Sequence, residues 1–230
     1  MAGPEFPPLL TGRAVAGDPF GVACEAAEDA DPGTVFYSPD ETTFRVAILL
    51  APEAPLGEAI SVSFAAQLGL NDALGALSPP EVAVHLVWPD RIRVNGGLCG
   101  RMRVAASTED PAAEPDWLVI GLEVPLLPSG ADEPGQTPNE TCLHEEGCGT
   151  VTAGDLVETW ARHMMNWLHI YMTDGFGDLH EEWRSKAHAL GEEITYPETG
   201  QFVGLDEWAG MILKDGSTTR ILPLTRVLDP

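Results

Sequence analysis

The stretch from Val82 to Met102 constrains the fold more than any other part of the chain. An apolar run is interrupted at Trp88 to Asp90, and an alternation of arginine and apolar residues then leads into Asn95 to Gly97. Asn-Gly between two alternating runs is a strong short-range signal for a β-hairpin. The stretch therefore predicts a buried strand, a break and an antiparallel hairpin.

The remaining periodicity predicts a chain that mixes strands and helices. Runs rich in apolar and β-branched residues predict strands, and apolar residues at helical spacing predict helices. We expect strands over 42–50, 82–88 and 117–126, helices over 56–77, from Thr152 to Tyr171 and over 176–190, and a small meandering sheet over 202–224. The segment from Pro4 to Thr34 shows no regular pattern and is expected to be irregular.

Composition excludes several classes of protein. The 230 residues are 44% apolar, which is enough for one main domain with a small appendage. A formal charge of −24, from 36 acidic and 12 basic residues, opposes nucleic-acid binding. No apolar run approaches the roughly 18 residues of a membrane span, and the first ten residues do not resemble a signal peptide. We expect a cytoplasmic protein that binds neither nucleic acid nor membranes.

The cysteines do not predict a disulfide framework or a metal site. Cys24 and Cys99 are isolated, whereas Cys142, His144 and Cys148 could in principle supply three metal ligands. The segment from Pro128 to Gly149 that contains them is rich in Pro, Gly and Glu and has no Cys-x-x-Cys pair, which favours a solvated surface loop. We therefore predict no metal.

The layout of the hairpin resembles the central signature of the biotin/lipoate protein ligase family. That signature reads Lys-Trp-Pro-Asn-Asp, a short strand, Asn-Gly and then Lys-Leu-Ala/Cys-Gly, and here Trp88, Pro89 and Leu98 to Gly100 match it. The tail is similar to the small C-terminal module of the same family. The resemblance implies an α+β fold of the class II synthetase type over residues 1–194, with a mixed or antiparallel central sheet flanked by helices. It also implies a small SH3-like β module over residues 195–230.

The resemblance also implies a function and a set of site residues. Members activate a small carboxylic acid such as biotin with ATP and Mg²⁺, form an acyl-adenylate, and transfer the acyl group to a lysine of a biotinyl or lipoyl carrier domain. By the family's register, Gly100 and Met102 would face the ligand, whereas Arg101 and Arg103 would point away from it. The ligand-binding candidates are Trp88, Pro89, Asp90, Gly97, Leu98, Cys99, Gly100, Met102 and Gly121.

The chain departs from the family where phosphate chemistry needs cations. Val87 and Gly97 stand at the two lysine positions of the signature, so the catalytic residue is unknown. The family's glycine- and arginine-rich loop corresponds to 36–43, which contains neither residue type, and the later Gly-x-Asn has become Glu123-Val-Pro125. Acyl-adenylate formation gathers negative charge that must be offset by cations or N–H donors. The groups that handle phosphate in the family are thus missing together.

Four arginines close to the hairpin could compensate for this loss. Because side chains alternate along a strand, a three-residue loop would align all four on one face, whereas a two-residue loop would divide them between the faces. One face would form an anion site, and the competing interpretation is salt bridges to the abundant acids. The four are Arg91, Arg93, Arg101 and Arg103.

Three functional hypotheses follow. The first is a biotin/lipoate ligase-like enzyme in which an arginine replaces the missing lysine. The second is a non-catalytic binding or interaction protein on the same scaffold, because a fold does not fix a function. The third is an ATP-independent acyltransferase, which would need Cys99 as nucleophile and a neighbouring base or cation to activate it.

Overall fold

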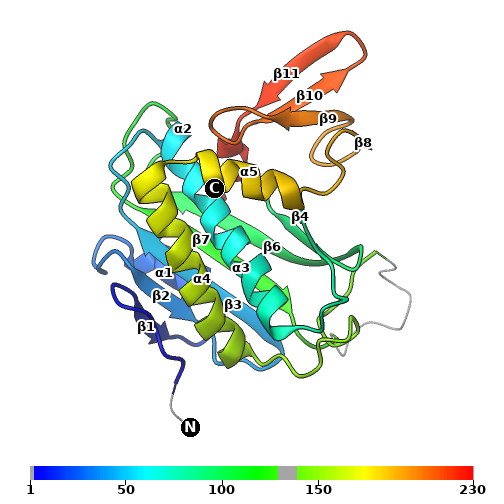
Figure 1. The fold of residues 1–230 in the computed structure, drawn as a ribbon. Coiled ribbons are helices and arrows are strands. Elements are labelled where there is room, and N and C mark those ends of the chain that lie inside the picture. The colour runs from blue at the N-terminus through cyan, green and yellow to red at the C-terminus, as the bar shows by residue number, and fades with distance from the viewer. Residues whose placement is uncertain (1–2, 129–138, 230) are drawn as a thin grey trace.

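The computed structural model describes residues 3–128 and 139–229, and a seven-stranded sheet runs through its centre (Figure 1). Its order is β1-β2-β3-β7-β6-β5-β4, with β1 and β2 parallel and every other neighbouring pair antiparallel. The predicted mixed sheet is thereby confirmed. The strands are β1 (Thr11–Ala14), β2 (Thr34–Tyr37), β3 (Thr43–Leu50), β4 (Val84–Val87), β5 (Arg91–Val94), β6 (Gly97–Ala106) and β7 (Leu118–Pro125).

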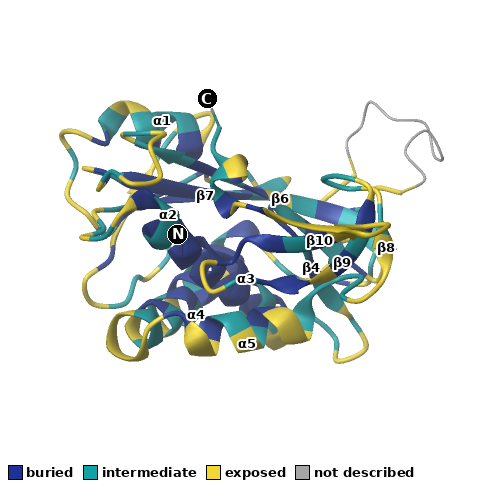
Figure 2. Ribbon diagram, turned by 90° about the horizontal axis from the view of Figure 1, so that it is seen from above, coloured by how far each residue is buried: buried dark blue, intermediate teal, exposed yellow. Residues whose placement is uncertain are grey.

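Helices lie on both sides of this sheet (Figure 2). On one side they enclose the main core, and on the other the short helix α1 (Pro19–Ala26) covers a smaller core. The single helix predicted over 56–77 is instead α2, a 3₁₀ turn (Ile60–Val62) and α3. The larger group is α2 (Leu56–Ala59), α3 (Ser63–Leu77), α4 (Ala153–Asp174) and α5 (Gly177–Lys186).

Helices α3 and α4 approach each other closely because a glycine lies at their crossing. A Cβ added to Gly69 would lie 2.8 Å from Cα of Met164, so no larger side chain fits there without moving a helix. Beside this crossing the buried Trp160 donates its indole N–H to the carbonyl of Ala66 at 3.0 Å. The apolar stripe predicted for α4 is therefore its packing face.

The C-terminal module is a second, four-stranded sheet in the order β11-β10-β9-β8. The indole N–H of the buried Trp88 donates to the carbonyl of Ala209 at 2.7 Å, which ties this module to the main sheet. After the module the chain returns along β6, where the N–H of Asp229 donates to the carbonyl of Val104 at 2.8 Å. The strands are β8 (Glu193–Ile194), β9 (Gly200–Leu205), β10 (Met211–Asp215) and β11 (Thr218–Leu222), and a 3₁₀ turn (Leu224–Val227) follows them.

The expectation of irregular structure from Pro4 to Thr34 was wrong, because β1 and α1 lie within it. Asp18 caps α1 by accepting a hydrogen bond from the N–H of Phe20, and Pro19 occupies the first turn, where no intrahelical N–H bond is needed. A helix of eight residues, apolar at nearly every position, is too short and too uniform to show a clear period. The Asp-Pro start was the available signal.

Two further observations bear on the sequence predictions. None of the described helices is long and apolar enough to cross a membrane. The surface loop predicted over 128–149 falls partly outside the described residues, because 129–138 are not among them. Its described part, around Cys142 and Cys148, buries both thiols instead of exposing them to solvent.

Candidate functional site

The four hairpin arginines lie on one face of the sheet, the face that carries α1. The connection is the two-residue loop Asn95–Gly96, which alone would divide the arginines between the faces. A register shift around Cys99 compensates, so Arg91 lies directly opposite Arg101. Alternation then places Arg93 and Arg103 on the same face as these two.

All four arginines already have partners in the protein. Arg101 donates to the carboxylate of Glu123 at 2.9 Å, and Arg103 donates to Asp229 at 2.5 Å and to Asp18 at 2.8 Å. The guanidinium of Arg91 lies 3.5 Å from the ring centroid of Tyr196, and Arg93 donates to the carbonyl of Gly96 at 2.5 Å. Salt bridges and local contacts thus engage the guanidinium groups on this face.

Glu123 lies at the centre of this face, in register between two arginines. It is the cross-strand neighbour of Arg45 on β3 and of Arg101 on β6, and it accepts hydrogen bonds from both at 3.0 Å. Burial alone would raise the pKa of Glu123, but the two guanidinium groups together hold it below its usual value. We call this row the Arg45–Glu123–Arg101 ladder.

The turn between β2 and β3, at the position of the family's glycine- and arginine-rich loop, is closed by its own hydrogen bonds. Asp40 accepts from the N–H of Thr42 at 2.8 Å and from its hydroxyl at 2.7 Å. Arg45 donates to the second carboxylate oxygen of Asp40 at 3.2 Å. This turn therefore places the carboxylate of Asp40 next to the ladder, where it pairs with Arg45.

Gly121 lies beneath α1, and the first turn of that helix fills the space above it. A Cβ at Gly121 would lie 2.7 Å from Cδ2 and 3.2 Å from Cβ of Phe20. The crevice that remains, bounded also by Asp18, Arg103 and Glu123, has a volume of only about 10 Å³. That is barely room for one water molecule.

The other hairpin candidates point elsewhere. Met102 is buried in the main core on the helical side of the sheet. A Cβ added to Gly100 would lie 2.8 Å from the backbone oxygen of Glu123 and 2.9 Å from Cγ2 of Val124, so there is no room for a side chain. The strand alternation thus places Met102 on the helical side of the sheet and Arg103 on the side of α1. Leu98 exchanges backbone hydrogen bonds with 139–141, and Gly97 abuts Thr141.

Trp88, Pro89 and Asp90 line a concavity of about 390 Å³ between the hairpin and the C-terminal module. The hydroxyl of Tyr196 donates to the carboxylate of Asp90 at 2.6 Å. Burial raises the pKa of Asp90, and burial together with this carboxylate raises the pKa of Tyr196 to about 12. Trp88 contributes as a buried structural residue and offers little surface to a ligand.

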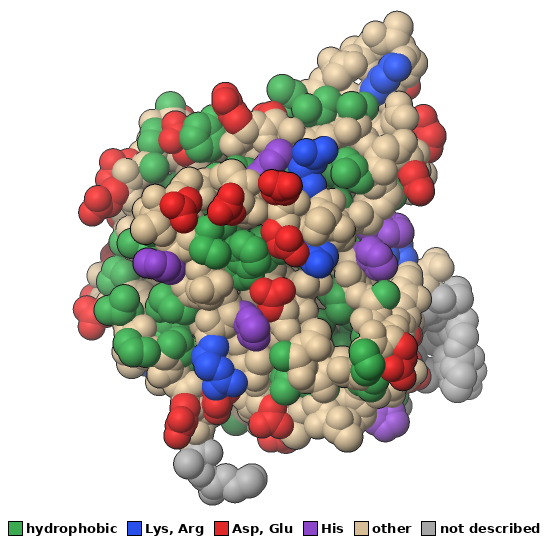
Figure 3. Space-filling model, viewed as in Figure 1, with side chains coloured by type: hydrophobic (Ala, Val, Ile, Leu, Met, Phe, Trp, Pro, Cys, Tyr) green, Lys and Arg blue, Asp and Glu red, His purple; other side chains and the backbone are tan. Residues whose placement is uncertain are grey.

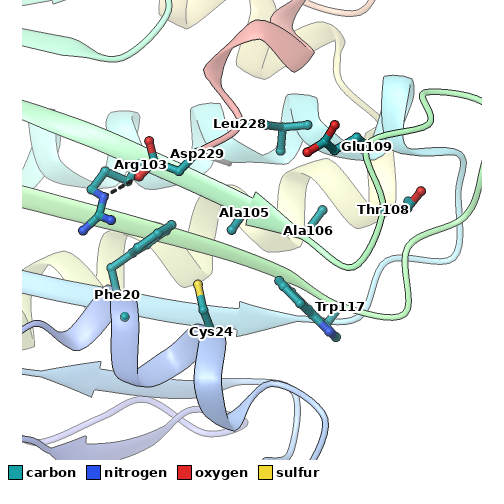
Figure 4. Close-up of a pocket in the computed structure, with 11 residues that line it drawn as sticks. Phe20, Cys24, Arg103, Ala105, Ala106, Thr108, Glu109, Trp117, Leu228 and Asp229 are labelled. Atoms are coloured by element: carbon teal, nitrogen blue, oxygen red, sulfur yellow. Dashed lines mark hydrogen bonds and ion pairs between the residues drawn. The ribbon is translucent and has the colours of Figure 1, made fainter.

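A second concavity, of about 470 Å³, lies between α1, the C-terminal end of β6 and the N-terminal end of β7 (Figure 4). We call it the α1 concavity. Of its residues the sequence singled out only Arg103, because the others come from four separate segments and share no motif. It is lined by Phe20, Gly21, Cys24, Arg103, Ala105, Ala106, Thr108, Glu109, Trp117, Leu228 and Asp229.

Burial disfavours the thiolate form of Cys99 and of Cys24. Cys99 is buried, and burial raises the pKa of its thiol to about 12. Cys24 borders the α1 concavity, but burial raises the pKa of its thiol to about 11. Among the described residues no group of three or more His, Cys, Asp or Glu side chains is arranged to hold a metal ion, Cys142 and Cys148 included.

Negative charge dominates the exterior as well. Acidic side chains are spread over the helical side, with only a few lysines and arginines between them (Figure 3). The field of such a surface repels anions at long range and favours the approach of cations. Any anionic ligand would therefore need strong local compensation.

Comparisons with known proteins give a consistent relationship. A family model described as "Biotin/lipoate A/B protein ligase family" matches residues 6–185, and one described as "Domain of unknown function (DUF4444)" matches residues 190–230. The biotin–[acetyl-CoA-carboxylase] ligase of Paracoccus denitrificans is 28% identical over 190 residues, covering 80% of this chain and 79% of that protein.

Two solved structures extend the comparison. A biotin protein ligase-like protein of unknown function from Silicibacter sp. TM1040 is 47% identical, covers 99% of this chain and 100% of its own, and superposes with a TM-score of 0.93. The biotin protein ligase of Aquifex aeolicus, solved with biotin and ATP, is 17% identical, covers 93% and 94% of the two chains, and shares the fold with a TM-score of 0.71. The chain belongs to the biotin/lipoate A/B protein ligase family.

Proposed function

We propose that this chain is a binding or interaction protein on the ligase scaffold that has lost acyl-adenylate formation. The observation that carries the proposal is the Arg45–Glu123–Arg101 ladder. Adenylation would need free cations at this place, but the guanidinium groups of Arg45 and Arg101 are both paired with the carboxylate of Glu123. The scaffold is kept, and the phosphate chemistry is not.

The electrostatic argument extends to the whole α1 face. A triphosphate must be met by cations or N–H donors that are not already engaged. Here Arg103 is shared by two carboxylates, and Asp40 lies beside Arg45. Binding a polyanion would require breaking at least one of these pairs and bringing further negative charge close to Glu123. We expect that cost to leave ATP bound weakly or not at all.

The second candidate is a ligase that retains activity. The similarity to a relative named as a biotin ligase, and to a structure solved with biotin and ATP, favours it. It would use biotin or a related acid, ATP with Mg²⁺, and an arginine such as Arg101 in place of the lysine. It requires Arg101 to leave Glu123 when nucleotide binds.

An acyltransferase that uses Cys99 receives less support. The thiol is buried, its pKa is raised, and the charged group that acts on it is the carboxylate of Glu146, which disfavours the thiolate. The remaining partner of the family, a biotinyl or lipoyl carrier domain in the cytoplasm, is compatible with either of the first two candidates. We propose it as the partner, together with a small acid or another small ligand.

Calorimetric titration with biotin, lipoate and ATP plus Mg²⁺, singly and in combination, tests the proposal. We expect no heat from ATP and no pyrophosphate release when a carrier domain is added. Glu123→Gln, which frees Arg45 and Arg101 without adding bulk, should increase nucleotide affinity. Release of pyrophosphate by the wild type would refute the proposal and favour the ligase.

A further inference from the structure

The α1 concavity has the size and the lining of a small-molecule site. Its volume of about 470 Å³ lies within the range of roughly 300–1,000 Å³ that is usual for ligand pockets. Phe20 and the Arg103 guanidinium, which lies 4.1 Å from the Phe20 ring centroid, separate it from the closed crevice above Gly121. It is therefore distinct from the positions that the family signature identifies.

Apolar groups form the floor and one wall of the concavity. Ala105 leaves the floor open because its side chain is short, while Phe20, Cys24 and Trp117 form one side (Figure 4). The indole of Trp117 is only partly buried, so part of its surface is available for contact. Such a surface suits a flat apolar group, or a cation placed over a ring.

The charges that line the concavity are predominantly negative. Among the described lining residues Arg103 is the one cation, and Glu109 and Asp229 are the acids. Arg103 is also paired with Asp18, which lies outside the lining. Glu109 lies across from Trp117, near Leu228 (Figure 4). A carboxylate ligand would meet this negative potential unfavourably, whereas an ammonium group would be attracted.

We propose that the α1 concavity binds an organic cation, with an amine directed to the carboxylates of Glu109 and Asp229 and an apolar body packed against Trp117. This ligand class is opposite in charge to the small acids of the ligase reaction. The proposal holds whether or not the chain adenylates an acid. Pyrophosphate release would overturn the proposed function and leave cation binding intact.

A pair of probes that differ only in the charge of the side group tests the proposal. Tryptamine and indole-3-propionate share an indole and a two-carbon linker, and end in an ammonium and a carboxylate. Calorimetry and ligand-observed NMR on the full chain should show tryptamine binding at least about tenfold more tightly. The affinity for tryptamine should fall as salt is added.

Variants place the binding at this concavity. Glu109→Gln should weaken tryptamine about two- to fivefold, and Trp117→Leu should weaken it by a similar or larger factor. Asp215→Asn, an exposed acid at the end of β10, is the matched control and should leave the affinity unchanged. Asp229→Asn should narrow the preference for tryptamine over indole-3-propionate, because it releases Arg103.

Three results would overturn the inference. One is equal or tighter binding of indole-3-propionate to the wild type. Another is the absence of a tryptamine signal in both measurements at millimolar concentration. The third is a Glu109→Gln variant, folded by circular dichroism, that binds tryptamine as tightly as the wild type does.

Discussion

The contact between Gly121 and the first turn of α1 can be tested by adding a single methyl group. In Gly121→Ala the new Cβ would meet Cδ2, Cβ and Cγ of Phe20 at 2.7, 3.2 and 3.3 Å, all closer than ordinary van der Waals contact. Because Cβ of Phe20 is itself within 3.2 Å, a ring rotation cannot relieve the overlap, and α1 must move. We expect a loss of about 1–3 kcal/mol in the free energy of unfolding.

Gly75→Ala is the matched control. Gly75 lies in the interior of α3, is exposed, and has nothing within 4 Å of an added Cβ. The same chemical change should therefore stabilise the protein by about 0.5–1 kcal/mol. Urea titration followed by circular dichroism, with unchanged slopes, measures both variants on one scale.

A double-mutant cycle identifies the partner. Phe20→Ala alone should lower the free energy of unfolding by about 3–5 kcal/mol, because the ring is buried. In the Phe20→Ala background the contacts with Cδ2 and Cγ are gone and only the contact with Cβ at 3.2 Å remains. Gly121→Ala should therefore destabilise the protein clearly less than in the wild type, with a coupling of about 1 kcal/mol or more. A neutral Gly121→Ala in the wild type, or additive losses in the double variant, would refute the packing of α1 on Gly121.

Three further predictions concern charge, thiols and the missing lysine. Glu123→Gln should lower the free energy of unfolding at pH 7 by about 1 kcal/mol. The pKa of Glu123 in the folded protein lies below its usual 4.5, so this stabilisation is present above pH 4.5 and is lost as the pH falls through the folded pKa. Urea titrations of the variant and the wild type should therefore converge in acid. With a pKa of about 11, roughly one Cys24 thiol in a thousand is ionised at pH 8, so Cys24 and Cys99 should react slowly with a disulfide reagent until urea is added, and fast labelling of the native protein would contradict this. Gly97→Lys should lower the free energy of unfolding by about 1–3 kcal/mol, because its Cβ would lie 2.6 Å from Cγ2 of Thr141. Thr141→Ser, which removes Cγ2, should restore part of this loss, as measured by thermal unfolding.

Local patterns were sufficient to predict most of the main sheet and its helices. The hairpin signal at Asn95–Gly96 and the apolar runs of β3 and β7 correspond to the observed strands within one or two residues. These elements bury one or both faces, and the resulting periodicity is visible in the sequence. The C-terminal sheet was likewise recognisable from its turns.

The site was harder to predict because it depends on register and on distant segments. Whether the four arginines share a face depends on a bulge at Cys99, which the neighbouring Gly100 signals only weakly. The partners Asp18 and Asp229 come from opposite ends of the chain. The sequence shows Glu123 in place of a family glycine, but its pairing with Arg45 follows only from the strand order.

The return of the chain along β6 has a consequence for solubility. Beyond Arg101, β5 no longer accompanies β6, and the carbonyl of Val104 is covered by the N–H of Asp229. A strand edge left bare is a template for pairing with another molecule. Leu228 and Asp229 thus cover an otherwise open part of this sheet edge, and we expect their removal to expose it to pairing with another molecule.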